Sequence, residues 1–301
     1  MPYAVAIAGD GPDLAADLYL PPRVQEPVPA VVTGSGFAGV KEMLLPLFGK
    51  ALADAGIAML AIDYAGFGAS AGEPRQDLDP RAQIHDLRRG LDFLCRDRRI
   101  DASKLGVFGP SMCGAHALVI AGTDPRVRAA VSIVPFVRAP KSPPSRKLAY
   151  DLALDALRRV LFLPSRRIPV AGPPNSHAVM TTDGALDWLQ NMAASAPNFS
   201  NEITLRSLAR VAGYRPMRWV GRQGIKVPLR TILSTSDSIT PAALARQELR
   251  DVDQDIVEFP GSHFELFDEH LAGVLRLTVE WFVRHLSVSQ SRQPSQLRSS
   301  Q

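Results

Sequence analysis

Residues 3–135 alternate short apolar runs with stretches of helical periodicity, and this alternation restricts the fold more than any other feature. In the helical stretch Pro80–Arg96, apolar residues recur every three or four positions, whereas the runs between such stretches are too short for helices. The predicted strands are Tyr3–Ile7, Ala15–Leu20, Val28–Thr33, Ile57–Asp63, Lys104–Phe108 and Ala129–Pro135, and the other predicted helices are Lys41–Ala55 and Ser111–Ala121. Alternation of this kind indicates an α/β protein with a mostly parallel sheet and helices on both faces.

The alternation stops at about Arg138 and resumes at Val227. Between them the sequence predicts only helices, at Arg146–Leu161, Asp183–Ala194 and Glu202–Ala212. It then predicts strands at Val227–Ser234 and Asp255–Glu258 and helices at Pro241–Arg250 and Ala272–Leu286. We therefore expect a core formed by residues 1–137 and 223–286, with residues 138–222 inserted as a helical cap. Residues 287–301, rich in Ser, Gln and Arg, are expected to be disordered.

The net charge of +4 raises the question of nucleic-acid binding. Between Arg138 and Arg230 there are fifteen Lys or Arg residues against five Asp or Glu residues, so the basic excess lies in one segment. This segment lacks the interleaved aromatic residues of a single-strand binder, and we expect no nucleic-acid partner. Two interpretations remain open for it: a solvated helical surface, or an electrostatic attractor for an anionic substrate or carrier.

The two cysteines and the hydropathy of the chain indicate the cellular compartment in which the protein is expected. No run of about 18 apolar residues is present, and Met1–Gly9 has no basic segment, so we expect neither a membrane partner nor a signal peptide. Cys95 and Cys113 are far apart and form neither a metal-ligand pair nor a disulfide framework. We expect a cytoplasmic protein without a bound metal.

The sharpest local motif is the apolar strand that runs through Phe108-Gly109-Pro110 into Ser111 and directly into a helix. Small residues around such a serine allow a strained elbow that exposes its hydroxyl group at the end of the sheet. The usual spacing Gly-x-Ser-x-Gly is altered, because Cys113 takes the last place and glycine follows at 114. We expect Cys113 to face the sheet. Ser111 is the predicted nucleophile, and a plain turn with Ser111 capping the helix is the alternative.

A serine hydroxyl needs a base, and the base needs an orienting acid. His263 lies in a turn after the last short strand, and Asp237 lies in the loop after Val227–Ser234. We predict His263 as the base and Asp237 as the acid. The alternatives are a structural histidine and a capping aspartate, with Asp63 and Glu265 as weaker candidates for the acid.

The tetrahedral oxyanion requires two backbone N–H donors. The first predicted donor is the amide of Met112, directly after the nucleophile. The second is the amide of Phe37, in the turn Gly34-Ser35-Gly36-Phe37, where glycine lets the backbone approach the substrate. The two glycines could instead serve only to make a tight turn.

With serine, acid and histidine in this order, the chain resembles the α/β-hydrolase superfamily over residues 13–286. Three segments are similar to the thiohydrolase and polyketide-transferase-like branch, near the dienelactone hydrolases and Xaa-Pro-peptidase-like enzymes. They are Gly34-Ser35-Gly36 with Lys41-Glu42, the run from Ile62 to Ser70 with Gly72-Glu73-Pro74-Arg75, and the run from Asp237 to Pro241. The resemblance implies ester or thioester chemistry, no cofactor, and a place in secondary metabolism.

Several functions share these residues. The leading hypothesis is a serine esterase or thioesterase acting on a small-molecule or carrier-bound acyl substrate. Acyl transfer or lactonisation, and elimination from an acylated natural product, would use the same three residues. A peptidase is less favoured because no additional domain restricts access to the site. A non-catalytic binding protein is the hypothesis from another class, and the intact set of Ser111, Asp237 and His263 argues against it. The helices of the cap could also form a homodimer contact.

Overall fold

The computed structural model describes residues 1–23, 26–139 and 145–287, and within them eight strands form one sheet in the order β1-β2-β4-β3-β5-β6-β9-β10. The strands are β1 (Tyr3–Ile7), β2 (Leu14–Tyr19), β3 (Val28–Gly34), β4 (Ala58–Ile62), β5 (Ile100–Pro110), β6 (Val127–Ile133), β9 (Leu229–Ser234) and β10 (Asp255–Phe259). β2 pairs antiparallel with both β1 and β4, whereas from β4 to β10 the pairing is parallel. The predicted α/β architecture is confirmed.

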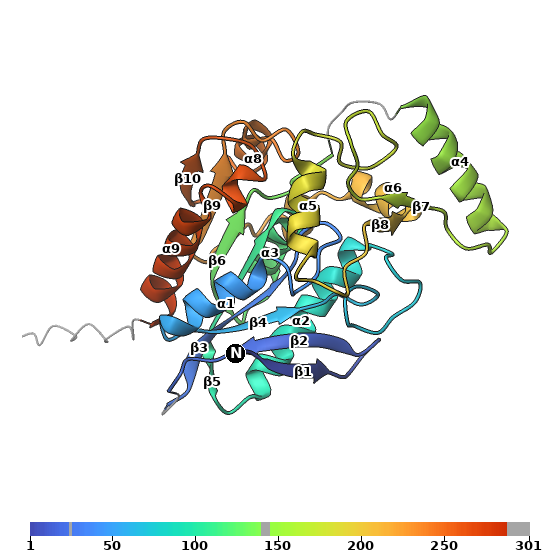
Figure 1. Ribbon diagram of the computed structural model, residues 1–301. Helices are drawn as coiled ribbons and strands as arrows, with labels where there is room; N and C mark the ends of the chain where they lie inside the picture. The colour runs from blue at the N-terminus through green and yellow to red at the C-terminus, as the bar shows by residue number, and fades with distance from the viewer. Residues whose placement is uncertain (24–25, 140–144, 288–301) are drawn as a thin grey trace, which may run out of the picture.

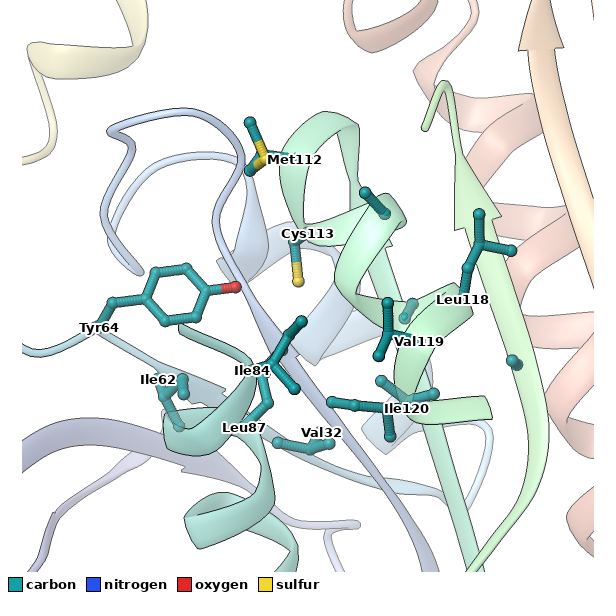
Figure 2. Packing of buried hydrophobic residues seen from close by; sticks show 14 of the residues in the cluster. Val32, Ile62, Tyr64, Ile84, Leu87, Met112, Cys113, Leu118, Val119 and Ile120 are labelled. Atoms are coloured by element: carbon teal, nitrogen blue, oxygen red, sulfur yellow. The ribbon is translucent and has the colours of Figure 1, made fainter. Parts of the chain in front are cut away.

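Helices cover both faces of this sheet (Figure 1). They are α1 (Leu45–Asp54), α2 (Pro80–Arg96), α3 (Ser111–Thr123), α8 (Ala242–Glu248) and α9 (Leu271–Phe282), with a π-helical turn at Val283–Ser287. α1 and α9 pack on one face, where Phe108 of β5 lies between Phe48 and Phe282. α2 and α3 pack on the other face, and Figure 2 shows Val32 of β3 and Ile62 of β4 near Ile84 of α2 and Ile120 of α3.

Two predictions of local structure need correction. The helix expected at Lys41–Ala55 begins only at Leu45. The amide of Lys41 instead donates to Asp63 Oδ1 at 2.7 Å, and Pro46 lies in the first turn of α1, where a missing N–H costs nothing. In the cap, two short strands were not expected: β7 (Arg167–Pro169) pairs antiparallel with β8 (Glu202–Thr204). Three-residue strands are too short to show an alternating pattern.

The segment predicted as a cap, residues 138–222, also contains α4 (Arg146–Val160), α5 (Ala185–Ala193), α6 (Leu205–Gly213) and α7 (Pro216–Val220). α5 lies toward the core, whereas α4 lies at the outer edge of the molecule (Figure 1). Buried cap residues such as Leu189, Ile203 and Tyr214 belong to the same apolar cluster as α2 and α3. The cap is therefore packed onto the core over a shared apolar interior.

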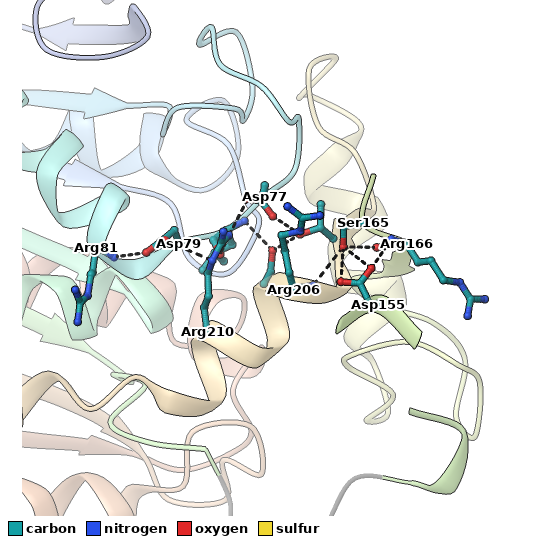
Figure 3. A network of polar contacts seen from close by, with 11 residues as sticks. Asp77, Asp79, Arg81, Asp155, Ser165, Arg166, Arg206 and Arg210 are labelled. Carbon is teal, nitrogen blue, oxygen red and sulfur yellow. Dashed lines mark hydrogen bonds and ion pairs between the residues drawn. The ribbon is translucent and has the colours of Figure 1, made fainter. Parts of the chain in front are cut away.

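Polar contacts fix the cap to the loop before α2 (Figure 3). Arg210 of α6 forms an ion pair with Asp77, with 2.7 Å between Nη1 and Oδ2, and Thr204 also bonds Asp77. The amide of Leu78 donates to the hydroxyl of Ser207 at 2.8 Å. The partners in these contacts are more than 120 residues apart in sequence. The contacts therefore hold α6 in place against the core.

The predicted disordered tail, residues 287–301, lies outside the described residues except for Ser287. Within the described part of the chain, no helix has the length and apolar character needed to cross a bilayer.

Candidate active site

Ser111 stands at the junction of β5 and α3, at the carboxyl end of a central strand. Its φ of 53° lies in the left-handed region, which a residue with a side chain adopts only when the surroundings enforce it. Gly109 is part of that enforcement, because a Cβ there would overlap Cys113 of α3. A Cβ on Gly114 would come within 3.0 Å of the carbonyl oxygens of Gly109 and Ile133. The local sequence thus folds into the predicted elbow.

Cys113 occupies the usual place of a glycine, and its thiol is fully buried. Figure 2 shows it pointing into the apolar core near Tyr64. The amide of Gly34 donates to Cys113 Sγ at 3.3 Å, so the side chain joins α3 to the end of β3. Burial raises the pKa of the thiol to about 11. Cys113 therefore stays protonated at neutral pH. Its side chain points into the core, as the sequence predicted.

Asp237 and His263 follow the two neighbouring strands β9 and β10 and meet above their carboxyl ends. His263 Nδ1 lies 2.6 Å from Asp237 Oδ2, and both side chains are buried. Two bonds hold the loops together: the amide of Ser236 donates to the carbonyl of Gly261 at 2.9 Å, and the hydroxyl of Ser234 to the same carbonyl at 2.5 Å. A carboxylate only accepts hydrogen bonds, so Nδ1 carries a proton, and in the neutral ring Nε2 is the nitrogen that can accept one.

The two carboxylate oxygens of Asp237 accept hydrogen bonds from different groups. Oδ1 accepts the amides of Ile239 and Thr240 at 2.8 and 2.7 Å, as in an Asx-turn, while Oδ2 faces His263. Burial raises the pKa of Asp237, but the hydrogen bonds from His263 and Thr240 outweigh that effect and lower the pKa below its usual range. Asp237 does not cap α8, whose N-cap residue is Pro241 without a side-chain hydrogen bond; of the two alternatives that the sequence presents, the structure shows the contact with histidine.

The two weaker candidates for the acid bind backbone amides instead. Asp63 accepts the amides of Lys41 and Ala69, at 2.7 and 2.9 Å. Glu265 accepts the amide of Ser262. Of the three carboxylates, Asp237 is the one that contacts the ring of His263 in the described structure.

Thr240 is a residue that the sequence argument missed. Its hydroxyl oxygen lies 2.8 Å from Asp237 Oδ2, 3.1 Å from His263 Nδ1 and 3.0 Å from the carbonyl of Val134. The hydroxyl thus ties the Asp237–His263 pair to the end of β6. The spacing Asp-x-x-Thr could have indicated it, because an Asx-turn brings the fourth residue back to the carboxylate.

Of the predicted oxyanion donors, Met112 directly follows Ser111, and Phe37 lines the same cavity as Ser111. Met112 is the second residue of α3, so its amide has no acceptor within the helix. The turn holding Phe37 passes close to the nucleophile, because a Cβ on Gly36 would be 3.4 Å from the Cβ of Ser111. Gly34 serves another purpose: a side chain there would overlap the buried ring of Tyr64. The turn therefore needs glycine for packing, and it also brings the backbone to Ser111.

Ser111 and His263 line one cavity, whose remaining wall is mostly apolar. The core contributes Phe37 and Met43, the histidine loop contributes Phe264 and Phe267, and the cap contributes Met180, Trp188 and Leu189. The ring of Trp188 lies 5.0 Å from that of Phe264. Sequence analysis did not identify the cap residues; it placed Trp188 in a predicted helix, Asp183–Ala194, without assigning it to the site. Such a cavity suits an apolar group attached to a reacting carbonyl.

No cluster of three or more His, Cys, Asp or Glu side chains that could hold a metal ion occurs in residues 1–23, 26–139 and 145–287. The side chains that meet at the cavity are those of acyl chemistry: a serine at a helix N-terminus, a histidine, and an aspartate on the far nitrogen of that histidine.

Comparison with known proteins finds relatives that cover most of the chain. A family model described as "Serine aminopeptidase, S33" matches residues 25–269. The "Quorum-quenching protein AidA" of Acinetobacter baumannii is 27% identical over 288 residues, covering 93% of this chain and 94% of that protein. The "Polyketide transferase claH" of Penicillium crustosum is 28% identical, covering 86% and 89%. A "Thiohydrolase" of Eupenicillium brefeldianum is 27% identical and covers 71% of both chains.

Among solved structures, that of DcsB in complex with its substrate analogue superposes with a TM-score of 0.83 at 23% sequence identity. The match covers 96% of this chain and all of DcsB. At this identity the likeness concerns the fold, and it confirms the predicted α/β-hydrolase architecture. The relatives named thiohydrolase and polyketide transferase confirm the branch that the sequence motifs resemble.

Proposed function

The chain belongs to the serine aminopeptidase S33 family of α/β-hydrolase enzymes, and from this premise we propose that it cleaves a carboxylic ester or thioester through an acyl-enzyme on Ser111. One observation carries the proposal. Ser111 is held at a strained φ of 53° in the same cavity as His263, whose Nδ1 is bound to Asp237 at 2.6 Å. A serine that lines a cavity, a histidine in the same cavity and an ionised aspartate bound to that histidine are the parts that acyl transfer to serine requires.

The proposed reaction has two halves. Ser111 Oγ attacks the carbonyl carbon while His263 Nε2 takes the hydroxyl proton, and the oxyanion accepts hydrogen bonds from the amides of Met112 and Phe37. Collapse breaks the bond to the leaving alcohol or thiol, which receives the proton from His263. Water then attacks the acyl-enzyme with His263 again as base, releasing the acid and restoring Ser111. Asp237 stays ionised and steadies the imidazolium ring in both halves.

The cavity favours an ester or thioester over the peptides that the family description names. An aminopeptidase must bind the free ammonium group of its substrate, and a carboxylate is the usual partner for that charge. The residues that line the acyl cavity include no Asp or Glu. Apolar side chains such as Met43, Trp188 and Phe267 favour a hydrocarbon acyl group. The names of the polyketide transferase and thiohydrolase relatives support an acyl group from secondary metabolism.

Labelling with a fluorophosphonate, followed by intact-mass measurement, tests the proposal. Wild type should gain one probe adduct, whereas Ser111→Ala should gain none and His263→Ala should react far more slowly. Ser35→Ala is the matched control, because Ser35 is a second serine of the same cavity and its variant should still be labelled. Absence of labelling in folded wild type, or labelling that survives Ser111→Ala, would refute the acyl-enzyme on Ser111.

A further inference from the structure

Two of the segments that resemble the thiohydrolase-like branch, Lys41-Glu42 and Ile62–Ser70, meet at the carboxyl group of Asp63. Asp63 directly follows β4, whose last residue pairs with Gly34 at the end of β3. Residues 34–40, which follow from there, are called the oxyanion turn below. The side chain of Asp63 is buried, and it takes no part in the reaction proposed above. A buried carboxylate is stable only where its partners compensate for the loss of water, and one partner of Asp63 directly follows that turn.

The oxyanion turn carries Phe37, whose amide must stay within hydrogen-bond range of the oxyanion during the reaction. The amide of Gly39 donates to the carbonyl of Gly36 at 3.3 Å. This bond closes a four-residue turn with Phe37 and Ala38 at its centre. Ala38 has a φ of 57°, a conformation for which turns favour glycine. The turn therefore keeps this shape only with support from its surroundings.

Asp63 supplies support of this kind at the end of the turn. Its Oδ1 accepts the amide of Lys41 at 2.7 Å, so the chain that leaves the turn is bound to the end of β4. The carboxylate is itself held in place, because Oδ2 accepts the amide of Ala69 at 2.9 Å. The carbonyl of Asp63 accepts the hydroxyl of Ser70 at 2.7 Å, and a Cβ on Gly68 would overlap the carboxyl group. A carboxylate fixed on this side can hold the turn in one position.

The ammonium group of Lys41 compensates the negative charge around it. Its Nζ lies 3.1 Å from Glu42 Oε1 and 3.5 Å from Asp17 Oδ2, and 3.9 Å from Asp63 Oδ2. From the cap, Asn198 Nδ2 donates to Glu42 Oε1 at 3.1 Å. Because three carboxylates surround one ammonium group, removal of the Asp63 charge still leaves Lys41 paired with the other two. A variant at Asp63 therefore creates no unpaired buried cation.

We propose that Asp63 is a positioning residue for the oxyanion hole: by accepting the amide of Lys41, it holds the amide of Phe37 where the oxyanion forms. The inference rests on the proposed function, because it takes Phe37 as an oxyanion donor. The oxyanion exists only in the transition states and the tetrahedral intermediates. A displaced donor should therefore lower kcat and leave the binding of the ground state unchanged. Removal of one oxyanion donor typically lowers kcat by about 10²–10³-fold.

Two ketones measure oxyanion binding and ground-state binding separately. With 1,1,1-trifluoropentan-2-one, Ser111 Oγ bonds to the carbonyl carbon, His263 takes the proton and an oxyanion forms, whereas pentan-2-one binds without this addition. Asp63→Ala should weaken the trifluoroketone and lower kcat for p-nitrophenyl butanoate, each by about 10²-fold. The inhibition constant of pentan-2-one should change by less than about twofold. Asp63→Asn keeps one acceptor oxygen for two amides, so its losses should be smaller, about tenfold.

Asp155→Ala is the matched control, because Asp155 is also buried and accepts a backbone amide at 2.7 Å, that of Arg166 in the cap (Figure 3). This variant should lose stability but keep kcat and both affinities. Wild-type affinity for the trifluoroketone in Asp63→Asn, or in Asp63→Ala if that variant folds, refutes the positioning role. An equal loss in Asp155→Ala, or an equal loss of pentan-2-one binding, also refutes it. If Ser111→Ala binds the trifluoroketone as tightly as wild type, the acyl-enzyme on Ser111 is refuted instead.

Discussion

The turns at the carboxyl end of the sheet and the outer helix of the cap are built in opposite ways. In the turns, Asp237 and His263 are buried, and the carboxylate of Asp237 receives hydrogen bonds from two amides, a hydroxyl and an imidazole. In α4 the buried side chains are Asp151 and Asp155, whereas Leu157 and Val160 are exposed, and Phe162 just beyond the helix is 98% exposed. Hydrogen bonds therefore fix the reacting side chains in the turns, whereas α4 leaves large apolar side chains exposed.

Removal of the nucleophile Ser111, which lies in the first of these two regions, should have the largest effect on activity. We expect Ser111→Ala to lower kcat for ester hydrolysis by about 10⁴-fold or more, because no other group replaces Oγ. Ser111→Gly should be equally inactive but more stable than Ser111→Ala by about 1 kcal/mol, since glycine adopts a φ of 53° without strain. Ester assays and urea denaturation measure the two effects. Equal stability of the two variants would mean that the elbow stores no strain.

Replacement of glycine by alanine should have opposite effects on stability in the elbow and in the cap. Gly109→Ala places a Cβ against Cys113 in the elbow, and we expect a loss of about 3 kcal/mol in the free energy of unfolding. Gly213→Ala, at the end of α6 in the cap, meets no atom within 4 Å and should be neutral or stabilising by about 0.5 kcal/mol. Chemical denaturation of both variants checks the contrast. A mild effect at Gly109 would show that the elbow can relax.

Lowering the pH should weaken a buried contact between helix α3 of the core and the cap. His116 of α3 is fully buried, with Nε2 2.9 Å from Gln83 Oε1 and Nδ1 2.9 Å from the hydroxyl of Tyr214 in the cap. Burial lowers its pKa to about 3, so below pH 6.5 the unfolded chain binds a proton that the native protein refuses. Stability from this residue is therefore complete above pH 6.5 and falls with pH, by about 2 kcal/mol between pH 7.5 and pH 5.

Comparison with His116→Gln isolates this effect, because Asp63 works in the opposite direction. Burial raises the pKa of Asp63 to about 6, so its contribution is present at low pH and is lost as the pH rises through 6. Denaturation of wild type and His116→Gln at pH 7.5 and pH 5 should show the smaller acid sensitivity in the variant. The same sensitivity in both proteins would mean that His116 takes up a proton in the native state.

A cap residue should change selectivity without changing the chemistry. Trp188→Ala enlarges the narrow acyl cavity, and we expect the kcat/KM ratio of decanoyl to butanoyl p-nitrophenyl esters to rise about tenfold. Leu186→Ala is the matched control, because Leu186 lies on the same helix but does not line the cavity. If both variants change the ratio equally, the acyl-chain selectivity depends on the position of α5 as a whole and not on the side chain of Trp188.

The smallest effect is expected at the outer edge of the cap. Phe162→Ser should change the free energy of unfolding by no more than about 0.5 kcal/mol, because the ring is almost fully exposed. Phe108→Ala, at the centre of the aromatic cluster between α1 and α9, should cost about 3–5 kcal/mol. Thermal unfolding of both variants measures the difference. A large loss at Phe162 would show that its ring is covered in solution, as the predicted homodimer contact would allow.

Much of the core could be predicted from sequence because its signals are local. α2 has the predicted bounds, and the strand before Ser111 continues to Pro110. The elbow, the aspartate loop and the histidine turn each follow a recognisable apolar strand. The cap was less predictable: β7 and β8 are three residues long, and Asp155 is buried against the hydroxyl of Ser165. The division of the chain at residues 137 and 222 stays a prediction.

The sequence by itself determined the order of the strands and helices of the core, the position of Ser111 at a strand–helix junction, and the family. Each depends on hydrophobic period or on neighbours within a few residues. Tertiary structure decided that Asp237, rather than Asp63 or Glu265, meets His263, and that Thr240 supports the pair. It also brought Trp188 to the cavity that Ser111 and His263 line. These contacts join segments that are distant in sequence, and only packing of the sheet and cap brings them together.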